Sequence, residues 1–189
     1  MHKFFIALIA AAVAIAGSTA LSADSERVVS EYSFVVANAP TDAFSSDGRL
    51  RVRLMRWSTD EERRHLIEAG DKPSTILSAL PYVPVAGYLQ WPGGLEHSVR
   101  YARRTPRPDG GADIVMVVER PLWLWWDPAV KWAADQQFTV VQLRIKKDGT
   151  GEGRIATGQG FARDNDSGLV VSDTTKPAIL VDVRRESVK

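Results

Sequence analysis

Cysteine is absent from the 189 residues of this chain, so neither a disulfide bond nor a lipid-modified cysteine can form. The fold must therefore be stabilised by the burial of apolar surface. Domains of this size bury roughly 70% of the surface that the unfolded chain exposes. We expect a single domain that folds without covalent cross-links.

An excess of charge of one sign is also absent. The chain has 24 lysines and arginines against 23 aspartates and glutamates, with a formal net charge of +1. Proteins that bind nucleic acids usually carry a clustered basic excess. The one basic run, at residues 100–107, is more typical of a solvated strand face. We expect no nucleic-acid partner.

No apolar run is long enough to span a membrane. Residues 4–16 are continuously apolar, which falls short of the roughly 18–20 residues that a bilayer requires. A positive start at residues 1–3 and a small-residue exit at residues 17–23 complete the pattern of a secretory signal peptide. We predict cleavage after Ala20 or Ala23, a signal peptide at 1–23 and a β-rich domain at 24–189. The mature protein is expected in the periplasm or outside the cell, and not as an integral membrane protein.

Established catalytic motifs are missing as well. The sequence has no Gly-x-Ser-x-Gly, no His-Glu-x-x-His and no cysteine nucleophile. After removal of the signal only His65 and His97 remain, and Ser98 would point to the strand face opposite His97. We expect His97 to be structural. The turn at residues 164–168 lacks the spacing of a calcium loop. No catalytic residue, cofactor or metal site is predicted.

Short segments of alternating or β-branched apolar residues dominate the rest of the chain and predict strands. The expected strands cover residues 28–37, 50–55, 85–91, 96–103, 114–118, 138–145, 153–161 and 179–183. An open sheet of such strands would leave exposed edges. We therefore predict a mainly β fold, an antiparallel meander that closes as a barrel or a sandwich. The residues predicted to face inward are Tyr32, Phe34 and Val36; Leu50, Val52 and Leu54; His97, Val99 and Tyr101; and Ile179, Val181 and Val183.

The apolar spacing changes from that of strands to that of helices at about residues 59–80. Ser58 or Thr59, followed three residues later by Glu61 or Glu62, predicts a helix that begins with a capping box. Pro73 is placed to open a second short helix. We expect a small two-helix insertion here.

The segment between the two most apolar strands, 114–118 and 138–145, holds four of the six tryptophans. Alternation would send Trp123 and Trp125 one way and Trp126 the other, while Trp132 follows a little later. These indoles can close one end of the core, or they can form an apolar or sugar-stacking pocket. A ligand site at this end would contain Trp123, Trp125, Trp126, Trp132, Tyr88 and Tyr101.

Three groups of segments resemble an uncharacterised family of exported bacterial proteins. Residues 56–63 read RWSTDEER, residues 87–89 and 100–103 read GYL and RYAR, and residues 151–153 and 181–184 read GEG and VDVR. The resemblance implies export and a single compact domain, and it implies no activity. In the tryptophan segment the chain departs from the family.

Three functions follow as hypotheses. The first is non-enzymatic binding of a small apolar or glycan ligand, or of an envelope protein, by the tryptophan segment. The second is a hydrolase of envelope polysaccharide that uses two carboxylates from Glu96, Glu119 and Asp127, since glycosidases need such a pair. The third is a structural or assembly role in the cell envelope.

Overall fold

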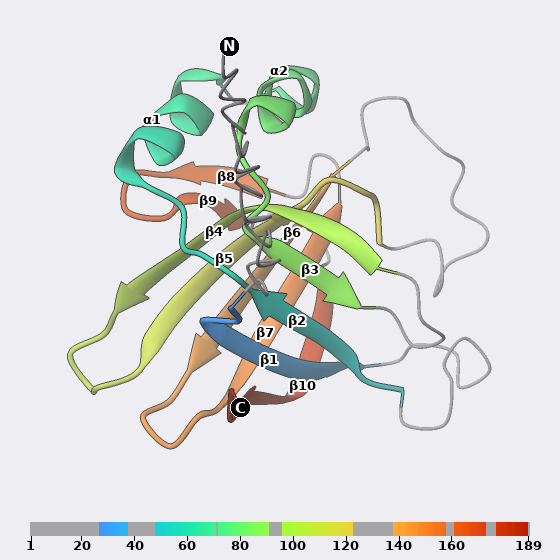
Figure 1. Ribbon diagram of the computed structural model, residues 1–189, viewed down its shortest axis with the longest axis vertical. Coiled ribbons are helices and arrows are strands. Elements are labelled where there is room, and N and C mark those ends of the chain that lie inside the picture. Colours follow the sequence, from blue (N-terminus) through green and yellow to red (C-terminus); the bar gives the residue numbers. More distant parts are fainter. Residues whose placement is uncertain are drawn as a thin grey trace, which may run out of the picture.

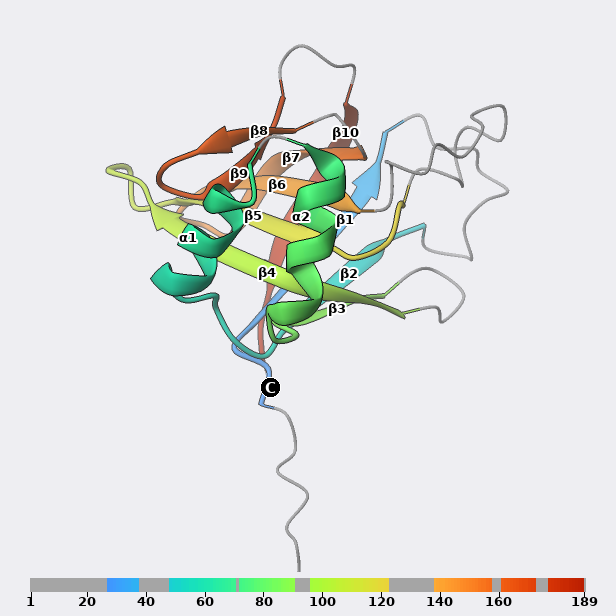
Figure 2. The ribbon, with the colours of Figure 1, turned by 90° about the horizontal axis from the view of Figure 1, so that it is seen from above.

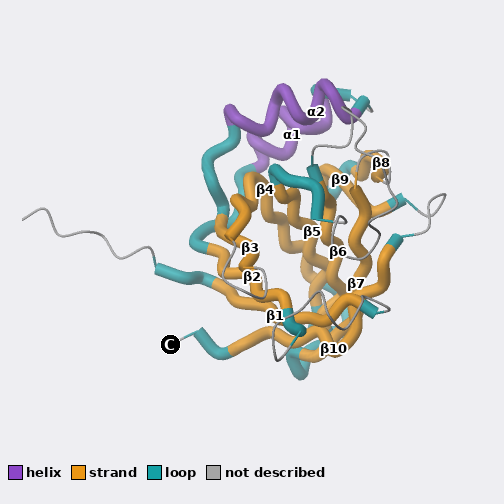
Figure 3. Tube along the Cα trace, turned by 90° about the vertical axis from the view of Figure 1, so that its right-hand side faces the viewer, coloured by secondary structure: helices purple, strands orange, loops and turns teal. Residues whose placement is uncertain are grey.

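Eight antiparallel strands form a closed barrel, which appears as a ring in the tube trace (Figure 3). Around the ring the order is β1, β10, β7, β6, β5, β4, β3 and β2. The strands span β1 Ser30–Val36, β2 Leu50–Leu54, β3 Gly87–Gln90, β4 Glu96–Pro106, β5 Ala112–Val118, β6 Thr139–Ile145, β7 Thr150–Thr157 and β10 Ala178–Glu186. The mainly β prediction is confirmed, and closure takes the form of a barrel.

This computed structural model describes residues 27–37, 48–70, 72–90, 96–122, 138–157, 161–172 and 177–188. The predicted signal peptide and most of the tryptophan segment lie outside these residues.

Two additional pieces lie on one side of the barrel (Figures 1 and 2). Helices α1 (Asp60–Glu68) and α2 (Pro73–Ala79), with a 3-10 turn at Leu80–Tyr82, connect β2 to β3. Strands β8 (Phe161–Asp164) and β9 (Gly168–Val171) form a separate hairpin between β7 and β10. The two-helix insertion is confirmed in its predicted place.

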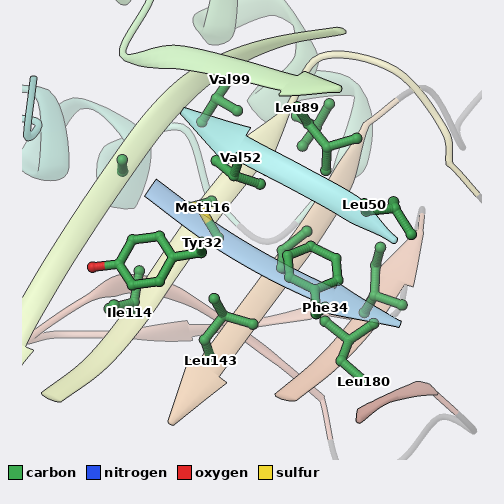
Figure 4. Close-up of a cluster of buried hydrophobic side chains, with 14 of the residues drawn as sticks. Tyr32, Phe34, Leu50, Val52, Leu89, Val99, Ile114, Met116, Leu143 and Leu180 are labelled. Carbon is green, nitrogen blue, oxygen red and sulfur yellow. The ribbon is translucent and has the colours of Figure 1, made fainter. Parts of the chain in front are cut away.

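Large apolar side chains fill the interior of the barrel. Tyr32, Phe34, Leu89, Met116 and Leu180 are at most 1% exposed and come from four different strands. Figure 4 shows these side chains converging between the strands. An eight-stranded barrel is just wide enough for such filling. The predicted inward faces of β1 and β2 are confirmed by the burial of their alternate residues.

A second apolar core lies outside the barrel wall, beneath the helices and the hairpin. Leu66 and Ile76 of the two helices pack with Val115 and Val117 of β5 and with Leu169 of β9. Strand β5 is therefore buried on both faces, which explains its nearly continuous run of apolar residues.

The N-terminus of α1 has the predicted capping box. The Thr59 hydroxyl accepts a hydrogen bond from the Glu62 amide at 3.2 Å, and the Thr59 amide donates to the Glu62 carboxylate at 2.8 Å. Ser58 instead pairs with Ala102 of β4, through its amide at 2.8 Å and its hydroxyl at 3.0 Å. The segment thus caps the helix and ties it to the barrel wall.

The predicted inward face of β4 is wrong at Tyr101. The pairing register with β5 shifts between Val99 and Tyr101, so an extra residue enters β4 there. Such a bulge reverses the face on which later side chains lie. Val99 faces the barrel interior, whereas Tyr101 belongs to the outer core.

The predicted inward face of β10 is wrong for two residues. Ile179 and Val181 are 47% and 42% exposed, while Leu180 and Val183 are buried. A register shift between Leu180 and Val183 and a left-handed Asp182, with φ of 49°, place both buried residues on the inner face.

The strand predicted at residues 153–161 is also wrong in extent. β7 ends at Thr157, and Phe161 already belongs to β8, which pairs only with β9. Periodicity predicts which residues are extended, but it does not say when a chain leaves one sheet for another.

Candidate functional site

The two ends of the barrel differ in the connections that they carry. Consecutive antiparallel strands run in opposite directions, so the connections β1–β2, β3–β4 and β5–β6 all join strands at one end. The link from β7 to the β8–β9 hairpin begins at this end, and the link from the hairpin to β10 finishes there. We call this the loop end; its strand termini are Val36, Leu50, Gln90, Glu96, Val118, Thr139, Thr157 and Ala178. The strand termini at the opposite end are joined by the tight turns after β4 and β6, at the lower left of Figure 1, and by the helical connection from β2 to β3.

Trp123, Trp125, Trp126 and Trp132 lie outside the described residues. The connection that contains them leaves β5 at Val118 and enters β6 at Thr139, so it begins and finishes at the loop end. Connections longer than roughly 12–15 residues are usually functional or disordered. The site predicted from these tryptophans therefore remains a prediction, with its attachment points now located.

The first part of this connection is anchored in the barrel. Leu122 is fully buried in the inner core, and its amide donates to the Thr139 hydroxyl at 2.9 Å. That hydroxyl donates in turn to the Arg120 carbonyl at 2.9 Å and lies 3.1 Å from the Thr157 hydroxyl. Leu122 thus closes part of the inner core at the start of this connection.

The inner face becomes polar at the loop end. His97 is paired with Leu89, whose side chain is in the inner core, so His97 lies on the same face and is partly buried. Burial and the nearby Arg120 guanidinium lower the pKa of His97, and Glu119 opposes them, so the imidazole is neutral at pH 7. Thr139 and Thr157 add two hydroxyls. These threonines were missed, although polar residues at inward strand positions were a readable signal.

The two predicted tyrosines do not meet at the loop end. Tyr88 is paired with Arg53 and Ser98 on the outer face of the wall and is partly exposed. Tyr101 is fully buried in the outer core, where its hydroxyl donates to the Ser167 carbonyl at 2.7 Å. The hydroxyl of Tyr101 thus joins β4 to the turn between β8 and β9, because the bulge in β4 has moved it away from the interior.

The carboxylates proposed for hydrolysis are each engaged by an arginine. Glu96 forms an ion pair with Arg53 of β2, and Glu119 forms one with Arg100 of β4 at 2.6 Å. Glu96 is adjacent to the inward His97, so it lies on the outer face of the wall. Asp127 lies outside the described residues. Each of the two described carboxylates therefore takes part in an ion pair on the wall: Glu96 reaches β2 across β3, and Glu119, just after β5, reaches β4.

Within the described part of the chain, no three histidine, aspartate or glutamate side chains are grouped so as to hold a metal ion. In the same residues, no helix combines the length and the apolar character needed to cross a membrane. Comparison of the chain with protein-family models, with curated proteins and with solved structures found no match.

Proposed function

We propose that this protein is an exported, non-enzymatic domain that binds a small apolar or glycan ligand at the loop end of its barrel. The observation that carries the proposal is the asymmetry of the barrel. One end carries the tryptophan-rich connection, while the opposite end carries the tight turns after β4 and β6 and the helical connection from β2 to β3, which is folded against the outer wall. Binding residues concentrate on loops that a rigid scaffold positions.

The packed interior supports a site at the rim rather than inside the barrel. Phe34, Leu89 and Leu143 occupy the space that a ligand-binding barrel leaves open. The inward side chains of His97 and Thr157, both partly exposed, place polar groups at the loop end next to an apolar core. Small-molecule sites usually combine a few polar groups with apolar and aromatic surface.

Export is supported by the position of the first strand. β1 begins at Ser30, downstream of both predicted cleavage points, so removal of the signal peptide leaves every barrel strand intact. The resemblance to exported bacterial proteins points the same way, and it allows an envelope protein as an alternative partner.

Tryptophan fluorescence tests the proposal. In a Trp57→Phe, Trp91→Phe background, the remaining indoles are those of the connection between β5 and β6. Titration with dodecanoate or with chitotetraose is expected to give a saturable change in emission with one of them. Replacing Trp125 and Trp126 by Ala is expected to abolish it, because stacked indoles supply the contact surface.

Two results would contradict this proposal. One is an unchanged emission with both ligands; the other is an undiminished response in the Trp125→Ala, Trp126→Ala variant. Release of reducing sugar from envelope polysaccharide, lost in Glu96→Gln or Glu119→Gln, would favour the hydrolase instead.

A further inference from the structure

A groove of about 390 Å³ lies on the outer wall of the barrel, across β6, β7 and β10. Its volume is within the range of small-ligand sites, roughly 300–1,000 Å³. The described residues that line it are Gln142, Arg144, Glu152, Gly153, Arg154 and Ile179. The neighbouring residues Leu143 and Leu180 point to the inner core, so the wall separates this groove from the barrel interior.

The orientation of one amide in the groove is determined by two donors. The Gln142 side-chain oxygen accepts from the Arg154 guanidinium at 3.1 Å and from the Val171 amide of β9 at 3.2 Å. With the oxygen engaged twice, the side chain offers its two N–H groups to a ligand. The hairpin thereby holds Gln142 in place as a donor.

The guanidinium groups add further donors. Arg144 pairs with Asp113 through its Nε atom at 3.2 Å, so the two terminal nitrogens of Arg144 are directed elsewhere. The Arg144 side chain is 56% exposed. Arg154 is the cross-strand neighbour of both Gln142 and Ile179. Guanidinium forks match the two oxygens of a carboxylate.

The remaining lining residues suit the body of such a ligand. Glu152, directly opposite Arg144, offers acceptors for hydroxyl groups. Ile179, 47% exposed, offers an aliphatic surface on the other side of the groove. Counting the two arginines against this one glutamate, the lining favours an anion over a cation.

From these contacts we propose that the groove binds a small carboxylate, with the acid group on Arg144 and on the Gln142 amide, which Arg154 orients, and the body against Ile179. The inference goes beyond the site at the loop end and does not depend on it. The same acid group occurs in uronic sugars and in aliphatic acids, and the two sources are distinguished by experiment.

Amide chemical shifts of the 15N-labelled mature chain test the groove. Galacturonate or hexanoate at millimolar concentration is expected to shift the backbone amides of Gln142, Gly153 and Ile179. The neutral counterparts, galactose and hexanol, are expected to leave them in place. A response to galacturonate alone identifies an acidic saccharide, and a response to hexanoate alone identifies an aliphatic acid.

Arg144→Gln is the decisive variant, and we expect it to weaken binding about tenfold or more because it removes the exposed fork. Arg51→Gln, at an exposed position on β2, is the matched control and should leave binding unchanged. The proposal is overturned by equal shifts with acid and neutral probes, by no shift with either acid, or by equal affinity of the wild type and Arg144→Gln. Since no tryptophan lines the groove in the described residues, its result is independent of the fluorescence test.

Discussion

At the scale of single residues, Tyr101 shows how one buried polar group joins distant parts of the chain. Its ring fills the outer core between β4 and α1, and its hydroxyl satisfies the carbonyl of Ser167. On the hairpin side, the Asp164 carboxylate accepts from the amide and the hydroxyl of Ser167, at 2.7 and 2.6 Å. The turn between β8 and β9 is thus bound to the barrel through a completed set of hydrogen bonds.

Tyr101→Phe is expected to lower the free energy of unfolding by about 1–2 kcal/mol, because it leaves a buried carbonyl without its donor. Urea unfolding followed by circular dichroism measures the loss. Tyr82→Phe is the matched control, since Tyr82 is 82% exposed, and its effect should lie within about 0.5 kcal/mol. Equal stabilities of the two variants would show that the hydroxyl of Tyr101 contributes nothing.

The same tyrosine makes stability depend on alkaline pH. Burial raises the pKa of Tyr101, and also that of Tyr32, above the ordinary value of about 10. The unfolded chain therefore ionises first, so stability is retained below about pH 10 and falls as the pH rises above it. Urea unfolding at about pH 8 and about pH 11 should show a smaller decrease in Tyr101→Phe than in the wild type. Parallel decreases would contradict this cause.

At the scale of elements, the segment that begins α1 is occupied by structural contacts. Arg56 donates to the Glu62 carboxylate at 2.6 Å, and Asp60 pairs with Arg103 of β4 at 2.9 Å. Together with the capping box, these contacts fix the first turn of the helix against the wall. The segment at residues 56–63 thus has a role in folding that its residues explain.

Thr59→Ala is expected to destabilise the protein by about 1 kcal/mol through loss of the cap. Thr59→Ser retains the hydroxyl and should remain close to the wild type. Glu61→Gln, at an exposed position of the same turn, should change stability by less than about 0.5 kcal/mol. Thermal unfolding of the three variants measures the order, and a Thr59→Ala variant as stable as Thr59→Ser would contradict it.

At the scale of the whole molecule, the barrel depends on a seam between its first and last strands. β1 pairs with β10 on one side and with β2 on the other, so it closes the ring. Two of its residues, Tyr32 and Phe34, are also among the largest fully buried side chains. Loss of β1 would open the core and expose two strand edges.

A chain that begins at residue 38 is therefore expected not to fold, whereas a chain that begins at residue 24 is expected to keep the full β content. Far-UV circular dichroism and gel filtration distinguish the two outcomes. A monomeric, cooperatively unfolding product from the shorter chain would contradict the role of β1 as the closing strand.

Local chemistry determined much of this protein from the sequence by itself: the inward residues of β1 and β2, the cap at Thr59, the two-helix insertion, and the barrel-or-sandwich class. Each depends on neighbours within a few residues, where periodicity and capping rules apply. Only the tertiary structure decided the bulges in β4 and β10, because a bulge is a mismatch between two strands and has no signature in one of them. It also decided that Tyr101 serves the outer core, and that Gln142 and Arg154 meet in a groove, since pairing across strands brings them together.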